Sequence, residues 1–307
     1  MLFLAVDSDQ QAWLDAFASV QPELKVITEE SLVDPARVRW VAAWNPEPGL
    51  FARFPGLEAV FALGAGVDAF MRRDDLAVDI PLVRLLDAGM AQQMVEYILW
   101  ATLTVQRDFD VYAEQQRQKL WREQTARTRD QIRLGILGLG ALGQEVAKTL
   151  KLYGYPVSGW KRSPLDLDGI PVFTGEAGLE ELVRQTDVLV SLLPNTPQTR
   201  GLLNAGLLGQ LPQGAALVNV ARGVQLVDKD LLALLDSGHL RLAVLDVFHQ
   251  EPLAEDHPFW QHPRVVVTPH MAAATLPGPA VEQVVASLKQ LEAGEEPRGL
   301  VRQASGY

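Results

Sequence analysis

The 307-residue sequence contains no cysteine, and this absence excludes several kinds of chemistry at once. Without a thiol the chain can form no disulfide, no thiolate nucleophile and no cysteine-ligated zinc site. Basic residues are also in the minority, because 27 Lys and Arg stand against 38 Asp and Glu, for a formal net charge of -11. No basic face of the kind that binds nucleic acid is evident in the sequence, so nucleic acid is not expected as a partner.

Long apolar runs are missing as well. The most apolar helical segment, YILWATLTV, is too short to span a bilayer and is flanked by Glu96 and Arg107. The opening MLFLAVDSDQ has no basic segment before its apolar run, and it is expected to form a strand rather than a signal peptide. With 48% hydrophobic and 21% charged residues, the composition is ordinary for a soluble globular protein with a sizeable core. Because neither a signal peptide nor a membrane-spanning segment is indicated, a soluble cytoplasmic protein without a membrane partner is expected by default.

Short apolar runs alternate with helical patterns along most of the chain. The first series of expected strands is LFLAVDS, RWVAAW, LEAVFAL and PLVRLL. A long helical pattern over about residues 91–118 separates it from a second series. That second series is RLGILG, YPVSGW, DVLVSLLP, AALVNVA, LAVLDVF and RVVVTPH. Continuous apolar strands between helices indicate parallel sheets covered on both faces, so we expect two α/β domains, each a doubly wound parallel sheet.

A glycine-rich turn opens the second series and not the first, which indicates an inserted domain. The predicted Rossmann dinucleotide-binding domain comprises residues 99–276. The predicted substrate domain is flavodoxin-like, comprises residues 1–98, and is completed by residues 277–307. A helix around Pro279–Ala293 is expected to pack on this substrate domain.

The turn itself has the spacing G-x-G-x-x-G. It consists of Gly138, Leu139, Gly140, Ala141, Leu142 and Gly143. The triplet alone is a weak signal, because a chain with 24 glycines can form one by chance. Here a strand runs into the turn and an amphipathic helix, ALGQEVAKTLKLYG, leaves it. That context predicts a dinucleotide with its pyrophosphate at the helix N-terminus, and a glycine turn without a ligand is the less favoured alternative.

The segment after the next strand bears on the choice of cofactor. A chain that binds NAD usually has an acid there that holds the ribose hydroxyls, whereas this chain has Trp160, Lys161, Arg162 and Ser163. Lys161 and Arg162 would pair with a 2′-phosphate, and Ser163 could add a neutral hydrogen bond. The two cations could instead be solvated loop charges. The pattern favours NADPH over NADH.

Three late strand ends carry the candidate catalytic residues Arg222, Glu251 and His270. Ligands of open α/β sheets bind outside the carboxyl ends of the strands, so these residues are expected to converge. Reduction of a keto-acid needs a cation for the carboxylate and a proton donor for the carbonyl oxygen, roles that suit Arg222 and His270. Glu251 would orient the imidazole and favour its protonated form. His249 is a weaker alternative acid, and no metal site is indicated.

Together, GLGALG, LLPNTPQTRGLL, NVARG, LDVFHQEPL and TPH resemble the D-2-hydroxyacid dehydrogenase family over essentially the whole chain. More narrowly, LGAGVD, GMAQQMVEY, GWKRS and the ending SGY are similar to the glyoxylate/hydroxypyruvate reductase A branch. The resemblance implies NADPH-dependent reduction of glyoxylate and hydroxypyruvate, an active-site cleft between domains and a homodimer. It assigns the family's Arg, Glu and His to Arg222, Glu251 and His270. One departure is that HMAAA follows the histidine, where many relatives have a glycine.

Further positions have a predicted contact and a purely structural alternative. Asp246 resembles the family residue that meets the nicotinamide carboxamide, but a strand-end turn also favours an acid. Ala65 and Gly66 could offer backbone N–H groups to the substrate carboxylate, or simply form a tight turn. Trp44 could restrict the substrate pocket or be a packing residue. Contacts with the dinucleotide are also predicted for Leu193, Pro194 and Ala221, and more weakly for Met90.

Two alternative functions fit part of the same pattern. The chain could reduce a larger 2-ketoacid, such as phenylpyruvate, with the same machinery, although bulky Trp44 favours small substrates. It could also be a dinucleotide-sensing module without turnover, since one fold hosts many functions. The intact set of Arg222, Glu251 and His270 favours an enzyme.

Overall fold

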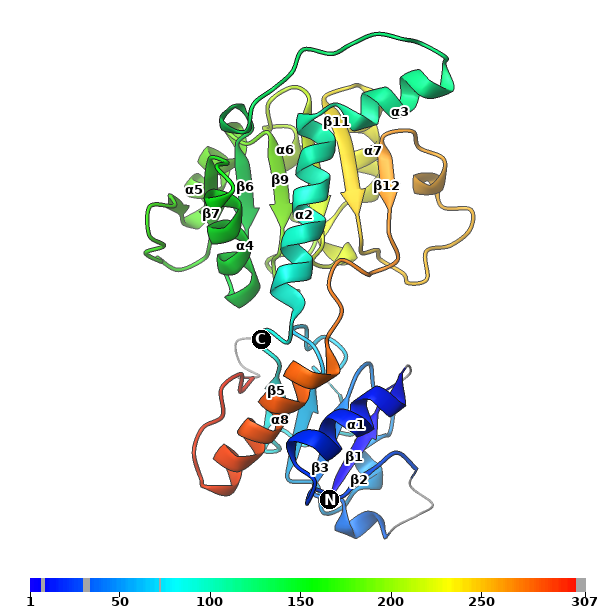
Figure 1. The fold of residues 1–307 in the computed structure, drawn as a ribbon, viewed down its shortest axis with the longest axis vertical. Helices are drawn as coiled ribbons and strands as arrows, with labels where there is room; N and C mark the ends of the chain where they lie inside the picture. The colour runs from blue at the N-terminus through cyan, green and yellow to red at the C-terminus, as the bar shows by residue number, and fades with distance from the viewer. Residues whose placement is uncertain (7–8, 30–33, 72, 302–307) are drawn as a thin grey trace. The chain divides into compact units, whose positions relative to one another are not determined.

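The computed structural model of the chain contains two compact α/β units (Figure 1). It describes residues 1–6, 9–29, 34–71 and 73–301, so the ending SGY lies outside the described residues. The smaller unit comprises Met1–Met90 with Ala274–Tyr307, and the larger unit comprises Ala91–Ala273. The predicted boundary between residues 98 and 99 falls inside helix α2 (Met90–Gln106). This helix is continuous and packs into the core of the larger unit, which in this division begins at Ala91.

The smaller unit is built on a five-stranded parallel sheet with the order β2-β1-β3-β4-β5. Its strands are β1 (Leu2–Ala5), β2 (Val26–Ile27), β3 (Trp40–Ala43), β4 (Ala59–Ala62) and β5 (Leu82–Arg84). Its helices are α1 (Gln10–Val20), α8 (Pro277–Glu292) and the 3₁₀ turns η2 (Pro35–Arg37) and η3 (Phe51–Arg53). The strand order is that of flavodoxin-like folds, as predicted. The C-terminal helix α8 packs against α1, so the end of the chain completes this unit.

The larger unit is built on a seven-stranded parallel sheet with the order β12-β11-β10-β9-β6-β7-β8. Its strands are β6 (Leu134–Leu137), β7 (Val157–Trp160), β8 (Val172–Phe173), β9 (Val188–Ser191), β10 (Ala215–Asn219), β11 (Leu240–Leu245) and β12 (Val265–Val267). Besides α2, its helices are α3 (Phe109–Arg117), α4 (Ala141–Leu152), α5 (Gly175–Arg184), α6 (Ala205–Leu208) and α7 (Asp228–Asp236). Its 3₁₀ turns are η4 (Arg129–Gln131), η5 (Gly223–Gln225) and η6 (Pro258–Trp260). This is the Rossmann order with one added strand, which confirms the predicted fold class.

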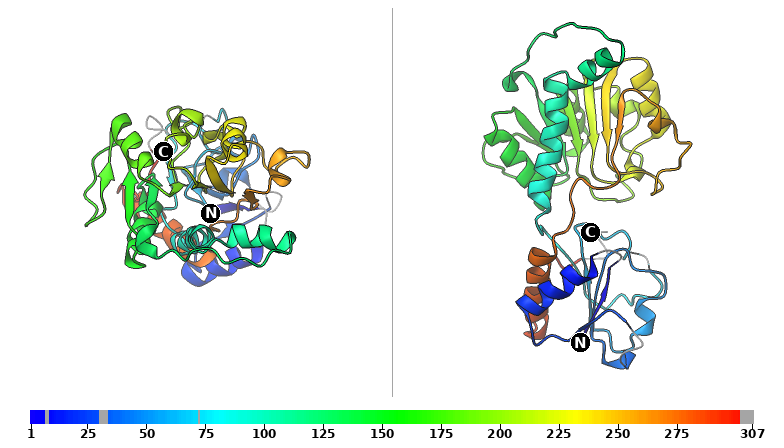
Figure 2. Two further views of the ribbon diagram at one scale, coloured as in Figure 1. Left: turned by 90° about the horizontal axis from the view of Figure 1, so that it is seen from above. Right: turned by 45° about the vertical axis from the view of Figure 1, so that its right-hand side comes forward.

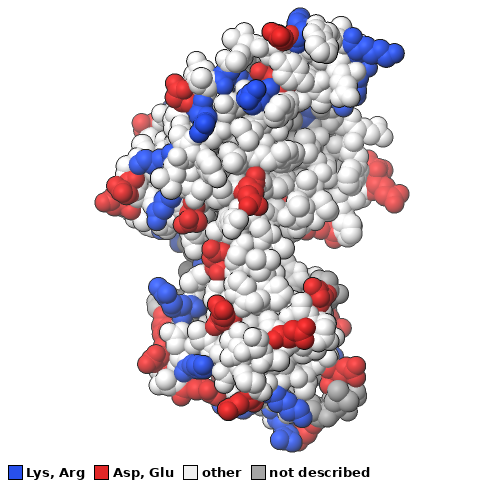
Figure 3. All heavy atoms as spheres, viewed as in Figure 1, with Lys and Arg blue, Asp and Glu red and all other residues white. Residues whose placement is uncertain are grey.

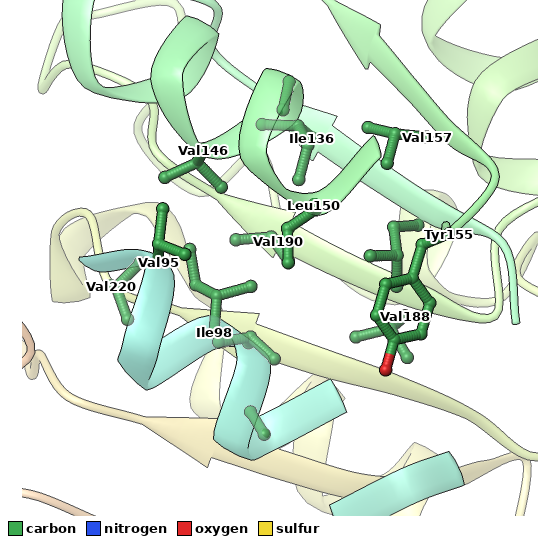
Figure 4. Packing of buried hydrophobic residues seen from close by; sticks show 14 of the residues in the cluster. Val95, Ile98, Ile136, Val146, Leu150, Tyr155, Val157, Val188, Val190 and Val220 are labelled. Atoms are coloured by element: carbon green, nitrogen blue, oxygen red, sulfur yellow. The ribbon is translucent and has the colours of Figure 1, made fainter. Parts of the chain in front are cut away.

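Alternation of side chains explains why the strands of the larger unit are apolar throughout. Val188 and Val190 of β9 enter the core beneath α2 and α4, whereas Leu189 between them enters the core on the opposite face of the sheet. Successive strand residues point to opposite faces, so a sheet covered on both faces needs apolar residues at every position. Figure 4 shows Ile98 of α2 and Val146 of α4 packed over the first of these faces, and Figure 2 shows α2 crossing the sheet.

The long helical pattern of residues 91–118 forms two helices rather than one. The chain leaves α2 and turns at Asp108, whose φ of 56° lies in the left-handed region. Two arginines bind the Asp108 carboxylate, Arg127 and Arg241, each at 2.8 Å. The two-residue strands β2 and β8 were also not expected, because a run of that length shows no periodicity.

Charged residues of both signs are distributed over the surface. On the face shown in Figure 3, described Lys and Arg residues are interspersed among Asp and Glu residues. Within the described ranges, no helix combines the length and the apolar character needed to cross a membrane.

Candidate active site

The turn between β6 and α4 uses its three motif glycines for different reasons. Gly138 has a φ of 98°, and a Cβ there would lie 2.7 Å from the Leu192 carbonyl oxygen. A Cβ at Gly143 would lie 1.9 Å from the Gly138 carbonyl oxygen, so the close approach of helix and strand requires glycine. At Gly140, in contrast, a Cβ would meet nothing within 4 Å, and φ is an ordinary −77°. The fold therefore requires glycine at the first and third positions but not at the second.

Gly140 instead keeps a space open at the N-terminus of α4. It is the N-cap residue of this helix, and no side chain caps the helix there. The first N–H groups of a helix have no intrahelical acceptor, and the helix dipole is positive at this end. A glycine with open space in front of these donors fits the close approach of a pyrophosphate. These residues thus suit the dinucleotide that the sequence predicts.

The segment after β7 is fixed next to this turn. The Gly138 N–H donates to the Trp160 carbonyl oxygen at 2.9 Å, and the Trp160 ring N–H donates to the Gly175 carbonyl oxygen at 2.9 Å. Lys161 is half-buried, whereas Arg162 and Ser163 are exposed. The first acid after the strand is Asp166. The end of β7 therefore presents two cations and a hydroxyl, a composition suited to a 2′-phosphate.

A buried glutamine, which the sequence pattern did not single out, holds the segment after β9. Gln225 is completely buried, and its Nε2 donates to the carbonyl oxygens of Leu193 at 2.9 Å and Pro194 at 3.1 Å. Its Oε1 accepts a hydrogen bond from Ser191 at 3.1 Å. Leu193 is buried and Pro194 is exposed. Because Gln225 ends a single 3₁₀ turn, no periodic pattern marks it as buried.

Glu251 and His270 are brought together by a hydrogen bond of 2.7 Å between Glu251 Oε2 and His270 Nδ1. The second carboxylate oxygen, Oε1, accepts the Phe248 N–H at 2.9 Å, which fixes the carboxylate plane. A carboxylate only accepts, so Nδ1 donates and the ring is oriented with Nε2 pointing away from the glutamate. Both side chains are little more than one third exposed, at 36% and 38%. This pair is the arrangement expected of an oriented proton donor.

Arg222 lies on the turn that packs against the segment leading to Glu251. A Cβ at Gly223 would lie 1.9 Å from the Phe248 carbonyl carbon, so only glycine allows these two backbone segments to approach. The Arg222 side chain is half-buried, and its Nη1 donates to the Ala221 carbonyl oxygen at 2.7 Å. The fully buried Asn219, at the end of β10, accepts the Ala221 N–H at 3.2 Å and donates to the Arg222 carbonyl oxygen at 3.3 Å.

Asp246, at the end of β11, organises the loop that carries His270. It is 1% exposed, and its carboxylate accepts hydrogen bonds from Thr268 Oγ1 at 2.6 Å and from the N–H groups of Met271 and Ala272 at 2.9 Å each. The His270 N–H donates to the Asp246 carbonyl oxygen at 2.9 Å. These bonds hold His270 at a φ of 51°, a left-handed conformation that is unfavourable for a non-glycine residue.

The departure from a glycine after His270 therefore has a local explanation. The histidine itself takes the positive φ, and the amides that follow it bind Asp246. The nicotinamide contact of Asp246 stays a prediction.

Tyr97 of α2 extends this network. Its hydroxyl lies 2.6 Å from Thr268 Oγ1. The single hydroxyl proton of Thr268 is given to Asp246, so Tyr97 donates to Thr268. Burial raises the pKa of Tyr97 to about 12. Neither Tyr97 nor Thr268 was predicted, because the pairing of residues 171 positions apart leaves no trace in the sequence.

The alternative acid His249 has other partners. Its Nε2 lies 2.7 Å from the Leu226 carbonyl oxygen and 3.6 Å from the Asp228 carboxylate. Glu251 pairs with His270 instead, as the hypothesis of a Glu–His couple requires.

The remaining predicted residues lie in the smaller unit. Trp44 follows β3 and is 42% exposed, and its ring covers Gly64, where a Cβ would lie 2.1 Å from a ring carbon. Ala65 and Gly66 follow β4 and are half-buried. Met90 is 5% exposed, and the Thr275 hydroxyl lies 3.8 Å from its sulfur.

Comparisons with known proteins give the family and the relatives that the chain resembles. The family model for the NAD-binding domain of D-isomer specific 2-hydroxyacid dehydrogenases matches residues 99–272. A relative named glyoxylate/hydroxypyruvate reductase A, from Yersinia enterocolitica, is 42% identical over 304 residues, which cover 97% of each chain. A relative of the same name from Salmonella paratyphi B is 43% identical over 300 residues, which cover 96% of each chain.

Two solved structures are similar over the whole chain. A D-isomer specific 2-hydroxyacid dehydrogenase from Xanthobacter autotrophicus, in complex with NADPH and MES, has a TM-score of 0.95 and 41% identity, covering 100% of this chain and 99% of that one. An NADPH-dependent glyoxylate/hydroxypyruvate reductase from Sinorhizobium meliloti, in complex with NADP and sulfate, has a TM-score of 0.93 and 33% identity, with the same coverage.

Replacing Gly140 with Ala should weaken NADPH binding by about tenfold or more while leaving the fold intact, because the added Cβ enters the space that a pyrophosphate needs. Isothermal titration calorimetry with NADPH measures the binding, and urea denaturation measures the stability. Gly143→Ala is the contrasting variant, since its Cβ would overlap the Gly138 carbonyl and should lower the free energy of unfolding. Normal NADPH binding by Gly140→Ala would show that no phosphate approaches here.

Replacing Tyr97 with Phe should change how stability depends on alkaline pH. The pKa of Tyr97 is raised on folding, so its contribution is fully present below pH ~10, the pKa in the unfolded chain, and is lost as the pH rises towards 12. In this window one buried phenol lowers the free energy of unfolding by up to about 1.4 kcal/mol per pH unit. Urea denaturation between pH ~10 and ~12, the interval between the two pKa values, should show the free energy of unfolding falling less steeply with pH for Tyr97→Phe than for the wild type.

The exposed Tyr153, replaced by Phe, is the control. Equal slopes for Tyr97→Phe, Tyr153→Phe and the wild type would contradict the burial of the Tyr97 hydroxyl.

Proposed function

The chain belongs to the D-isomer specific 2-hydroxyacid dehydrogenase family, and on that premise we propose that it reduces glyoxylate and hydroxypyruvate with NADPH. The observation that carries this proposal is the 2.7 Å hydrogen bond between Glu251 and His270, in the same unit as the glycine turn. A dinucleotide-sensing module would not need an imidazole oriented by a carboxylate. The names of the relatives and the cofactors of the solved structures support the choice of substrate and of NADPH.

NADPH, when bound, supplies the hydride that attacks the carbonyl carbon of the substrate. His270 donates the proton that the carbonyl oxygen takes up, so that the 2-ketoacid becomes a 2-hydroxyacid. Glu251 holds Nδ1 and thereby directs Nε2 to the reacting oxygen. Arg222 binds the substrate carboxylate through its guanidinium. Lys161 and Arg162 would hold the adenosine 2′-phosphate, with Ser163 as a further donor.

A small substrate is favoured over a larger 2-ketoacid by the position of Trp44. Its ring covers Gly64, directly before the amides of Ala65 and Gly66 that we propose as donors to the substrate carboxylate. A bulky side chain on the substrate would have to displace this indole. A cytoplasmic location stays a prediction.

The function is tested by NADPH oxidation at 340 nm across short and long 2-ketoacids. We expect kcat/KM for glyoxylate and hydroxypyruvate to exceed that for phenylpyruvate by at least about tenfold, since pocket size decides among chemically equal substrates. We also expect NADPH to be preferred over NADH by at least about tenfold, because Lys161 and Arg162 would otherwise lack their anionic partner. An equal or better kcat/KM with NADH would contradict the cofactor assignment.

His270→Ala is the control for this assay. It should lower kcat by about 100-fold or more and leave NADPH binding close to the wild type, because only the proton donor is removed. Turnover that survives in His270→Ala would remove this residue from the mechanism.

We further propose that the protein forms a homodimer through the segment from Trp100 to Trp121. Large apolar side chains in this segment are exposed, up to 99% for Trp121. The others are Trp100, Phe109, Tyr112 and Leu120. The segment is nonetheless fixed, because Asp110 of α3 pairs with the largely buried Arg241 of β11. An anchored apolar segment of this kind favours a protein partner, and a second copy agrees with the family resemblance.

Trp121→Glu together with Leu120→Glu should convert a dimer to a monomer, because two charges would be buried at the interface. Light scattering after size-exclusion chromatography measures the mass. Leu152→Glu, at a side chain that is 87% exposed on another surface, should leave the dimer unchanged. A monomeric wild-type protein would rule out this interface.

A further inference from the structure

The loop after β4 is fixed through three successive carbonyl groups. The Leu63 carbonyl oxygen accepts a hydrogen bond from the Thr275 hydroxyl at 2.9 Å. The Gly64 carbonyl oxygen accepts from the Leu85 N–H at 3.2 Å, and the Ala65 carbonyl oxygen accepts from Arg84 Nη1 at 3.1 Å. All of these residues belong to the smaller unit. The carbonyl groups of this loop are therefore held by hydrogen bonds to the rest of the smaller unit.

The donor side of the same loop has no such partners. In the part of the chain that the structure describes, no acceptor is found for the N–H groups of Ala65 and Gly66. A trans peptide unit points its C=O and its N–H in opposite directions. A carbonyl group of Ala65 held towards Arg84 therefore turns the Gly66 N–H away from Arg84, and the Gly64 carbonyl likewise turns the Ala65 N–H away from Leu85. Consecutive N–H groups on one side of a turn are suited to bind an anion.

Arg84 is suited to hold this loop because its own backbone is fixed. It ends β5, its N–H donates to the Gly299 carbonyl oxygen at 3.0 Å, and its side chain is half-buried. Gly299 has a φ of 90°, and a Cβ there would lie 2.3 Å from the Arg84 carbonyl oxygen. Glycine at that position allows the C-terminal segment to pack directly on the end of β5. The backbone from which the Arg84 side chain extends is thus fixed.

A cation at the acceptor end of a peptide also strengthens the donor at the other end. Hydrogen bonds in a chain polarise one another, so a charged donor on the Ala65 carbonyl makes the Gly66 N–H a better donor to an anion. A neutral donor at this position would fix the loop but would polarise it less.

We propose that Arg84 is a positioning residue that orients and polarises the peptide between Ala65 and Gly66 for binding of the substrate carboxylate. Arg84 acts through this peptide and not through contact with the reacting carbonyl. The inference rests on the proposed function, because it assigns the 2-ketoacid carboxylate to these amides. It adds a residue that the sequence motifs do not include.

The test compares Arg84→Met, which keeps the length of the side chain but removes its charge and donors, with Arg84→Lys, which keeps a charged donor. Arg37→Met is the matched control. It removes an exposed arginine of the same unit from η2. Because η2 precedes β3 and the loop follows β4, its parallel neighbour, the two lie at opposite ends of these strands. Two quantities are measured for each variant: KM and kcat for glyoxylate, and the Kd of oxamate, a non-reducible 2-ketoacid isostere, by calorimetry with and without NADPH.

For Arg84→Met we expect KM and the oxamate Kd to rise by about tenfold or more, with kcat within about threefold of the wild type, since a charge-assisted binding interaction is lost. Arg84→Lys should recover part of the loss, and Arg37→Met should match the wild type. Equal values of KM and oxamate Kd for Arg84→Met and Arg37→Met would overturn the inference. A fall in kcat without a change in KM or Kd would also overturn it.

The oxamate measurement separates this inference from the proposed function. If the wild type reduced no 2-ketoacid but bound oxamate in an Arg84-dependent way, the function would be wrong and the inference would stand. If the wild type reduced 2-ketoacids and Arg84→Met matched Arg37→Met, the function would stand and the inference would fail. If Arg84→Met did not fold by circular dichroism, the comparison would be made with Arg84→Gln, which keeps neutral donors.

Discussion

The candidate active site depends on one buried carboxylate, that of Asp246 at the end of β11. Its three hydrogen bonds reach both sides of His270, to the Thr268 hydroxyl before it and to the Met271 and Ala272 amides after it. The loop is thereby held in a conformation that puts a non-glycine residue at a positive φ. Such a conformation persists only where the surroundings over-determine it. Asp246 therefore fixes the backbone that carries the imidazole, and Glu251 fixes the ring itself through Nδ1.

Backbone contact brings the remaining parts of the site together. The turn of Arg222 and the segment before Glu251 touch at Gly223, and helix α4 approaches strand β6 at Gly143. At both places the space for a side chain is missing. Gly140 is the opposite case, because the space in front of it is open, as the close approach of a pyrophosphate requires. Among the three glycines of the motif, this comparison separates Gly138 and Gly143, which the fold requires, from Gly140, which suits a cofactor.

The polar residues that support the site share a mode of action. Gln225, Thr268 and Arg84 each bind a carbonyl or a carboxylate of a loop that carries a predicted ligand contact. None of them needs to touch the substrate to affect binding or turnover. Precision at the site therefore comes from residues behind the loops as much as from those that face the ligand.

The sequence by itself determined the two parallel sheets, the glycine turn, the cations after β7 and the identity of the Arg, Glu and His candidates. These features are local, since apolar runs and motif spacings involve residues that are close together in the sequence. The sequence did not determine the break at Asp108 or the hydrogen-bond partners of Tyr97, Thr268, Gln225 and Arg84. Those depend on strand order and register, which bring Tyr97 to Thr268 across 171 positions. The sequence does not distinguish a buried polar residue from a solvated one. Only the tertiary structure brings such a residue to its hydrogen-bond partner.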